Sequence, residues 1–458
     1  MKNSTMFKII SIVLAIITSI SFLLFCGSFF SENDSDTSIN ANTSETSDSI
    51  TSKDSVSDVS ISIDSSFDDS KDEEQMPKDT VVSFLACPDN IIHPSVFYDA
   101  IERKAVQNNT KPVFNDLHNA DYDFSPIYEY VANDISYADI AYINQETLIG
   151  GTSGKIIGYP CFNSPNAVAD TVIDLGFDVV NVAHNHMLDS GNTKYLENCN
   201  SVFENEGLEV IGYYPDNEST ENITVIESKG IKVAFLAYTY GTNGIRLPSK
   251  SEFIIPYLNE DLVTKQVKIA KEISDIVIVS CHWGYEDTFN PNSEQKKYAE
   301  LMTELEVDVV LGMHPHVIQP MEWKTASSGH KTLVVYSLGN FVSGMVAGKN
   351  MLAGMLSINI VRDAETAEVY IDTPLFVPIV THYVKKTRVA SNDTGYRDFK
   401  IYPLIDYTEE LASEHGVRKY ESSHGTTLVG GKFSVESLNT TLKKYIPDEF
   451  LPIEFKND

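Results

Sequence analysis

The sequence is poor in positive charge: 34 Lys and Arg residues stand against 65 Asp and Glu, for a formal net charge of −31. Such a charge opposes attraction to nucleic-acid phosphates, so we expect no nucleic-acid partner. The five cysteines form no closely spaced pair, which argues against a disulfide scaffold and a CxxC zinc site. The sequence also has no internal repeat and no glycine-rich phosphate loop. Its 42% of apolar residues and its length of 458 residues predict a large folded core instead.

A long hydrophobic run lies near the N-terminus. Residues 9–30 carry no charge and follow two lysines, and a helix needs about 20 apolar residues to cross a bilayer. We therefore predict a signal anchor over residues 1–30, which makes the protein a single-pass protein of the cell membrane with an extracytoplasmic folded domain. A lipoprotein anchor at Cys26 is the alternative, because Leu23–Cys26 resembles a lipobox. A buried core helix is the third and weakest interpretation.

The next segment, residues 31–80, has a different composition. It holds 14 Ser and 14 acidic residues but only 3 Lys, with few large apolar side chains. Such a segment buries too little surface to offset its ordering entropy. We predict a disordered linker that holds the following domain away from the membrane.

From residue 81 onward, short β-branched runs alternate with amphipathic stretches of helical period. Strands are predicted at 81–87, 140–143, 178–182, 233–237, 276–280, 309–311 and 333–337. Helices are predicted at 165–175, 193–206, 262–273 and 293–305. This alternation predicts an α/β fold over residues 81–345.

Residues 346–458 give weaker signals. Strands at 355–361 and 368–371 and a helix at 434–445 are predicted to complete or flank the domain. His382 and His415 are expected to be surface or loop residues without a chemical role.

Possible metal ligands follow nearly every predicted strand of residues 81–345. In α/β folds, ligands bind at the carboxyl ends of the strands. The residues there are Asp89, Asn90, His93, Asn144, Glu146, His184, Asn185, His186, Asp189, His282, His314, His316 and Asn340. Each alone has an ordinary explanation, such as a turn cap or a surface histidine. Six of the eleven histidines are among them, however, and together they predict a metal or catalytic cluster.

The residue types in this cluster suit a two-metal hydrolytic centre. Carboxylate, imidazole and amide ligands favour two divalent transition-metal ions, Mn, Fe or Zn. Two ions roughly 3.5–4 Å apart activate water and stabilise a group in transfer. Glu146 is the predicted bridging ligand, and His314-Pro315-His316 is predicted to be extended, so that both imidazoles face one site. His186, or otherwise His184, is the predicted proton donor, and we group Asp189 with them as catalytic.

These segments resemble the CapA family of bacterial capsule-synthesis proteins, which are associated with poly-γ-glutamate production. The resemblance covers about residues 81–345 and rests on Asp89…His93, Asn144-x-Glu146, Asn185-His186-x-x-Asp189-x-Gly191, His282-Trp283-Gly284 and His314-Pro315-His316-Val317-x-Gln319. It implies a four-layer α/β sandwich similar to the calcineurin-like metallophosphoesterases.

The resemblance also implies the metal ligands. Asp89, His93, Glu146 and His316 would hold one ion, and Glu146, Asn185, His282 and His314 the other. Asn90, Asn144 and Asn340 are predicted to contact substrate or to support the ligands.

The sequence departs from the family pattern at three positions and from the metallophosphoesterases at a fourth. Pro88, Gln145 and His184 replace a glycine, a leucine and an asparagine, and Glu146 stands where metallophosphoesterases use a bridging aspartate. No predicted ligand is lost, but the longer Glu146 side chain could alter the metal spacing.

Two functions are the main interpretations of this pattern, and a surface phosphatase unrelated to capsule synthesis is a third. The first is a membrane-anchored, metal-dependent hydrolase acting on a cell-surface polymer or phosphoester. The second is a non-catalytic accessory subunit that works with membrane subunits of a capsule-synthesis complex. In either case an anionic polymer is the expected partner, which Lys155 or Arg246 could contact.

Overall fold

The computed structural model describes residues 78–420 and 428–456. The predicted membrane anchor (1–30) and all but the end of the predicted linker (31–80) lie outside these residues. Within them, no helix is long and apolar enough to span a bilayer.

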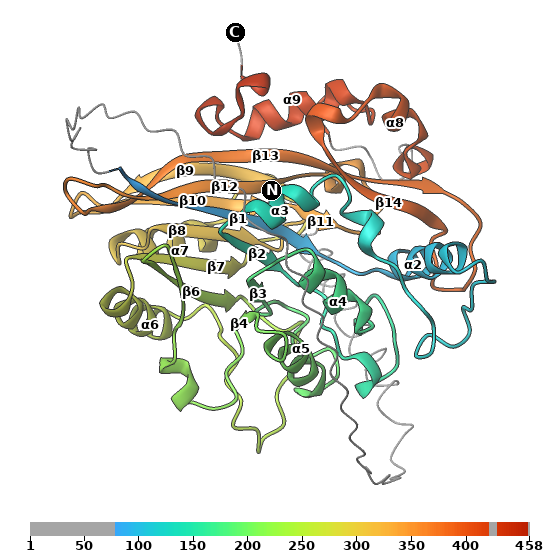
Figure 1. Ribbon diagram of the computed structural model, residues 1–458, viewed down its shortest axis with the longest axis horizontal. Helices are drawn as coiled ribbons and strands as arrows, with labels where there is room; N and C mark the ends of the chain where they lie inside the picture. The colour runs from blue at the N-terminus through green and yellow to red at the C-terminus, as the bar shows by residue number, and fades with distance from the viewer. Residues whose placement is uncertain (1–77, 421–427, 457–458) are drawn as a thin grey trace, which may run out of the picture.

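The fold is mixed α/β, as predicted, and is built on two β-sheets (Figure 1). The eight-stranded sheet has the order β14-β13-β12-β1-β2-β3-β4, and β11 pairs with β1. Its strands are β1 (Thr80–Asn90), β2 (Ile140–Asn144), β3 (Val179–Asn181), β4 (Glu209–Ile211), β11 (Asn340–Val342), β12 (Leu352–Arg362), β13 (Val369–Lys385) and β14 (Tyr396–Pro403). The strands β1 to β4 are mutually parallel, whereas β12, β13 and β14 continue the sheet in antiparallel fashion from β1.

The six-stranded sheet has the order β5-β6-β7-β8-β10-β9. Its strands are β5 (Thr224–Ser228), β6 (Ile231–Thr239), β7 (Ile276–His282), β8 (Val309–Met313), β9 (Ile318–Thr325) and β10 (Lys331–Leu338). The central strands β6, β7, β8 and β10 are parallel. A parallel strand needs cover on both faces, which explains why these segments are almost entirely apolar.

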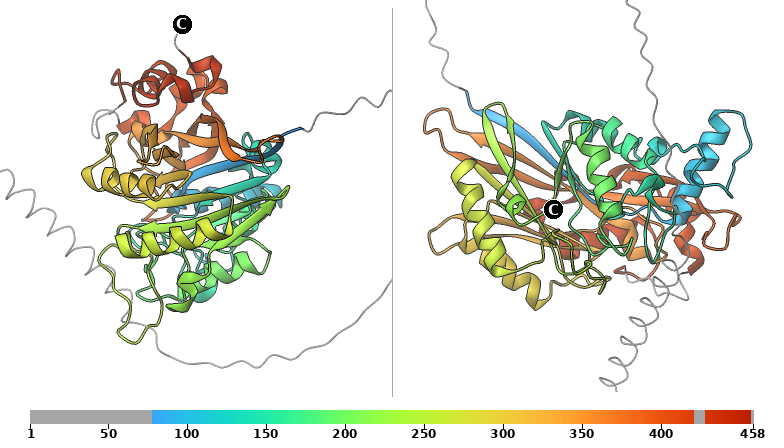
Figure 2. Two further views of the ribbon diagram at one scale, coloured as in Figure 1. Left: turned by 90° about the vertical axis from the view of Figure 1, so that its left-hand side faces the viewer. Right: turned by 90° about the horizontal axis from the view of Figure 1, so that it is seen from below.

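The helices cover the outer faces of the sheets. They are α2 (Pro94–Gln107), α3 (Ala132–Tyr137), α4 (Ala167–Asp174), α5 (Lys194–Glu204), α6 (Glu260–Ile273), α7 (Ser293–Glu304), α8 (Glu409–Glu414) and α9 (Val435–Tyr445). In β6, alternate residues belong to two cores: Val233 and Phe235 pack in the core shared by the two sheets, and Ala234 and Leu236 pack with α6 and α7. Figure 2 shows the red C-terminal helices against the orange strands of the larger sheet.

The predicted strands and helices are present, with ends that mostly differ by a few residues; β13 is the exception, since it continues to Lys385 where the prediction ended at residue 371. The helix α2 was not predicted, although Pro94 at its first turn is a typical helix start. Strand β1 is longer than predicted and includes Asp89 and Asn90, because it also pairs with β11 beyond the point where β12 leaves it. Asp89 therefore belongs to the sheet itself and not to a loop after it.

Candidate metal centre

A row of buried polar residues crosses the larger sheet at the carboxyl ends of its parallel strands. Asp89 in β1 lies beside Asn340 in β11 and Asn144 in β2, and Asn144 lies beside Asn181 in β3. Asn181 Nδ2 donates to Asn144 Oδ1 (2.8 Å), and Asn144 Nδ2 donates to Asp89 Oδ1 (2.7 Å). This chain of hydrogen bonds fixes the Asp89 carboxylate, whose second oxygen, Oδ2, faces the smaller sheet.

The segment His314-Pro315-His316 follows β8 and faces this oxygen. The backbone N–H of His314 donates to Asp89 Oδ2 (3.2 Å), and His316 Nδ1 lies 3.2 Å from the same atom. The prediction that the segment is extended is wrong, because His314 (φ 94°) and His316 (φ 56°) both have left-handed backbone conformations.

Such conformations cost about 1–3 kcal/mol each in residues other than glycine and persist where the surroundings impose them. Here the surroundings are Asp89, Asn340 and Asn350. Asn350 Nδ2 donates to the His316 carbonyl (3.0 Å), and Asn340 Oδ1 lies 3.0 Å from His316 Nδ1. The centroids of the two rings lie 5.6 Å apart. The rings are close because the segment turns, and not because it is extended.

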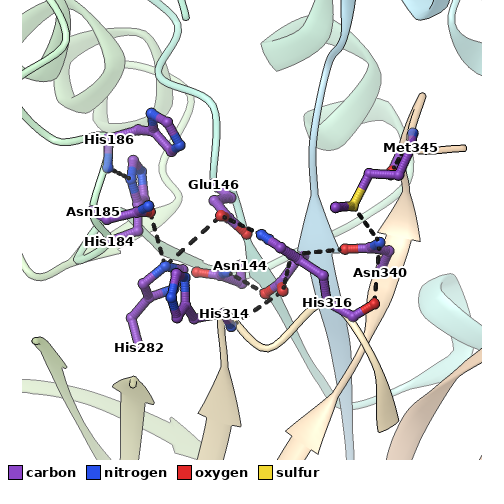
Figure 3. A network of polar contacts seen from close by, with 12 residues as sticks. Asn144, Glu146, His184, Asn185, His186, His282, His314, His316, Asn340 and Met345 are labelled. Carbon is purple, nitrogen blue, oxygen red and sulfur yellow. Dashed lines mark hydrogen bonds and ion pairs between the residues drawn. The ribbon is translucent and has the colours of Figure 1, made fainter. Parts of the chain in front are cut away.

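Glu146 lies at the centre of the site (Figure 3). Its Oε1 is 3.5 Å from His316 Nε2 and 3.7 Å from His282 Nε2, so one carboxylate oxygen lies between two imidazoles. His282 is the last residue of β7 and His316 follows β8, so the smaller sheet supplies both rings. His314 lies close to His282, with ring centroids 4.7 Å apart.

Three groups of potential ligands result, each with donor atoms within 4.8 Å of one another. They are Asp89, Glu146 and His316; Glu146, His282 and His314; and Glu286, His314 and His316. The first two share Glu146 and correspond to parts of the two predicted ligand sets. The amide of Asn185 joins the second, because its Oδ1 lies 3.0 Å from His282 Nε2.

The electrostatics of the site favour a cation. Burial lowers the pKa values of His282 and His314 well below the usual value, so both are neutral at pH 7 and have free lone pairs. Burial also acts to lower the pKa of His316, but the Glu146 and Asp89 carboxylates outweigh it and raise this pKa to about 10. Burial raises the pKa of Glu146 well above its usual value. A positive charge placed between these carboxylates is therefore stabilised.

Buried polar atoms without hydrogen-bond partners also indicate a site for a cation. Within the described part of the chain, Glu146 Oε2 and His314 Nδ1 are buried and have no hydrogen-bond partner. Leaving a buried polar atom unpaired costs about 1–3 kcal/mol, so such atoms at a converging site need an explanation. Carboxylate and imidazole donors fit a divalent transition-metal ion, and the residues present fit the predicted centre.

His93 lies at the edge of the cluster. Its Nδ1 accepts a hydrogen bond from the Gly344 N–H (3.1 Å), its ring contacts Phe162, and it belongs to none of the three ligand groups. Asn90 is directed away from the ligands, because its side chain bonds to Gln145 (2.8 Å) and Tyr128 (2.7 Å). Asn144 and Asn340 instead contact candidate ligands, Asp89 and His316 respectively.

The predicted proton donors differ in their surroundings. His186 Nδ1 lies 2.8 Å from Asp189 Oδ2, which also accepts from the Phe162 N–H (2.6 Å). His184 is fully buried, accepts the His186 N–H at its Nδ1 (3.1 Å), and burial lowers its pKa. His186 is 9% exposed and is thus the more accessible of the two.

Several residues of the site were not predicted. Asn181 and Ser280 lie inside strands and join the polar row, with Asn181 Nδ2 donating to Ser280 Oγ (3.2 Å). An amide within the apolar run Val179–Val182 is the signal that could have found Asn181. Glu286 was missed because it is exposed and stands in a loop without another ligand-type neighbour except Asp287.

A pocket of about 540 Å³ adjoins the cluster at His93. Its walls combine apolar residues, including Met345 and Val346, with the polar side chains of Asn350 and Lys349. Asn340 links the pocket to the cluster, because its Nδ2 contacts Met345 Sδ (3.4 Å) while its Oδ1 contacts His316.

The chain is similar to a known protein family and to individual proteins. Residues 85–345 match the family model described as bacterial capsule synthesis protein PGA_cap. The PGA biosynthesis protein CapA of Bacillus subtilis is 32% identical over 180 residues, which are 37% of this chain and 43% of that protein. The capsule biosynthesis protein CapA of Bacillus anthracis is 31% identical over 175 residues, or 37% and 41% of the two chains. The match thus spans less than half of the length of these relatives.

Solved structures with partial similarity include the NAD nucleotidase NadN of Haemophilus influenzae (TM-score 0.38, 14% identity, 68% of this chain and 53% of that chain). Another is the calcineurin-like phosphoesterase YfkN of Bacillus subtilis (TM-score 0.37, 11% identity, 70% and 94%). The family model itself matches more than half of the 458 residues. On this match, the chain belongs to the PGA_cap family of bacterial capsule synthesis proteins.

Proposed function

We propose that this protein is a metal-dependent hydrolase of the capsule synthesis family, acting on a cell-surface polymer or a phosphoester. The observation that carries the proposal is the placement of Glu146. One of its oxygens lies within 3.7 Å of imidazole nitrogens from both His282 and His316, and the other is buried without a partner among the described residues. A carboxylate in this position is suited to bridge two ions.

The ligand sets follow from this placement. One ion would be held by Asp89, Glu146 and His316, with His93 at the edge. The second would be held by Glu146, Asn185, His282 and His314. When bound, such ions supply a nucleophilic water of lowered pKa and positive charge for the transition state. Asn144 and Asn340 act indirectly, since they hold Asp89 and His316 in the orientations that binding requires.

His186 is the proposed general acid. With Nδ1 held toward Asp189 Oδ2 (2.8 Å), Nε2 is the ring atom that can give a proton to a leaving group. The buried Asp189 carboxylate fixes the ring orientation and the tautomer. His184, which is fully buried behind His186, is the less suitable donor.

The pocket at His93 has room for the organic part of a substrate. We propose that the substrate is an anionic polymer or its precursor, since the family and both curated relatives are described by capsule or PGA synthesis. We further propose that residues 9–30 anchor the chain in the cell membrane, that residues 31–80 form a linker, and that the domain is extracytoplasmic. Partner subunits of a capsule-synthesis complex would meet it there.

We also propose that the two sheets and their covering helices form a four-layer sandwich of the metallophosphoesterase type. The support is the packing of β6, which contacts the second sheet on one face and α6 and α7 on the other.

The proposal is tested by hydrolysis assays on the full chain in detergent after loading with Mn²⁺, Fe²⁺ or Zn²⁺. Phosphomonoesters, phosphodiesters and γ-glutamyl amides are the substrates to compare. We expect turnover of one class, and His186→Ala should lower kcat by about 10²–10⁴-fold with bound metal unchanged. Loaded protein that hydrolyses none of them would contradict the hydrolase and favour the accessory-subunit function.

A further inference from the structure

The loop that follows β7 is fixed against the turn that carries the two site histidines. The Trp283 N–H donates to the Met313 carbonyl (3.2 Å), and the Asp287 N–H donates to the Pro315 carbonyl (2.8 Å). These bonds fix residue 283 to residue 313, before His314, and residue 287 to residue 315, after it. Glu286 lies between the two attachment points, so its backbone has little freedom to move away from the histidines.

Asp287 secures the same loop from the other side. Asn350 Nδ2 donates to Asp287 Oδ1 (2.9 Å), and the Lys349 ammonium donates to the Asp287 carbonyl (3.0 Å). Asn350 also donates to the His316 carbonyl (3.0 Å), so one amide connects the loop and the turn. Gly284 (φ 90°) and Asp287 (φ 64°) have the left-handed conformations that bend the chain at the two ends of this loop.

This arrangement places the exposed Glu286 carboxylate next to buried imidazoles. A carboxylate oxygen of Glu286 and one ring nitrogen each of His314 and His316 lie within 4.8 Å of one another. The two histidines are only 3% and 5% exposed. His314 Nδ1 has no hydrogen-bond partner among the residues described, and no described lysine or arginine forms an ion pair with Glu286.

The charges around this point favour a cation. Asp89 and Glu146 already contribute two carboxylates to the centre, and Glu286 adds a third from the solvent side. A third carboxylate adds repulsion among the three, which a positive charge between them relieves. Glu286 is absent from both ligand sets that the family resemblance implies.

We propose that Glu286 is a further ligand of the metal centre, which binds a divalent transition-metal ion together with His314 and His316 and closes the centre on its solvent side. This inference rests on the proposed metal centre and adds to it a ligand from the β7–α7 loop. Because Glu286 is exposed, it is also the ligand that solvent or an incoming ion reaches first.

The test is isothermal titration of Mn²⁺, and separately Zn²⁺, into the full chain in detergent after removal of metal by a chelator. The variants are Glu286→Gln, Glu286→Asp and the matched control Glu294→Gln, which removes an equally exposed carboxylate at the start of α7. The exposed Gln side chain should leave the thermal unfolding of the metal-free protein unchanged.

We expect Glu286→Gln to weaken at least one binding step by about tenfold or more, Glu286→Asp to lie between, and Glu294→Gln to match the wild type. Equal metal dissociation constants for the wild type and Glu286→Gln would overturn this inference and leave the proposed function intact. A wild-type chain that binds neither metal would overturn both. Should Glu286→Gln fail to fold, an unweakened Glu286→Asp would count against the inference.

Discussion

Two groups of buried histidines in this molecule differ in what surrounds them. In the C-terminal part, His382 Nδ1 lies 2.8 Å from the Tyr407 hydroxyl, and His415 donates to the Thr381 carbonyl (2.9 Å) and accepts the Val417 N–H (3.1 Å). Within residues 78–420 and 428–456, these rings have hydrogen-bond partners and form no ion pair with a carboxylate. In the metal centre, the rings face Asp89 and Glu146.

The difference shows that burial alone does not identify a functional histidine. Burial lowers the pKa in both groups: that of His382 to about 4, that of His415 to about 3, and those of His282 and His314 well below the usual value. What separates them is the presence of converging carboxylates and of unpartnered atoms, such as Glu146 Oε2. We therefore propose metal binding only for the second group.

The largest expected effect comes from Glu146→Ala. Because Glu146 belongs to both ligand groups, we expect the bound metal to fall from about two ions per chain to near zero. His415→Ala is the control from the other group, and it should lower stability while leaving the metal content unchanged. Mass spectrometry measures the metal content of both variants. If His415→Ala folded but bound no metal, the distinction between the two groups of histidines would be wrong.

The second prediction concerns pH and the C-terminal histidines. The unfolded chain protonates His382 near pH 6.5, whereas the folded chain does so only near pH 4. The stability contributed by the neutral ring is therefore complete above about pH 6.5 and is lost as the pH falls toward 4. The expected loss is on the order of 3 kcal/mol in the free energy of unfolding.

Urea unfolding with a chelator present measures this loss, and His382→Gln removes the His382 contribution together with its effect on His415. The histidines of the candidate metal centre are unchanged by the substitution, so the difference between the two pH profiles belongs to the C-terminal pair. Parallel profiles for wild type and variant between pH 6.5 and 4 would show that this ring is not held neutral.

The third prediction is smaller and tests the support of the ligands. Asn144→Ala removes the hydrogen bond that fixes Asp89, so metal affinity should fall by roughly 10–100-fold without loss of the site. Asn439→Ala, at a half-buried position of α9, is the control. Titration with Mn²⁺ gives both dissociation constants, and equal values would mean that Asp89 is oriented by other contacts.

The convergence of strand-end residues could be predicted from the sequence, whereas their local geometry could not. Asp89, Glu146, His282 and His316 could be found because strand ends are visible as the limits of apolar runs, and parallel strands bring those ends together. The left-handed conformations of His314 and His316 could not be predicted, since they depend on Asn340 and Asn350, which come from a distant part of the chain.

The surface assignment of His382 and His415 was wrong for a similar reason. They are 4% and 2% exposed, because β13 is longer than its alternating pattern predicted and the segment with α8 packs over it. Local sequence gives no indication of which distant segment covers a strand. The exposed Glu286 was missed because its proximity to His314 depends on backbone bonds between two loops.

The most direct test of the metal centre is anomalous X-ray diffraction from crystals of the protein grown with Mn²⁺ or Zn²⁺. The account predicts two peaks that share Glu146, one beside Asp89 and His316 and the other beside His282 and His314. No peak at Glu146, or peaks only at other residues such as His382 and His415, would contradict it.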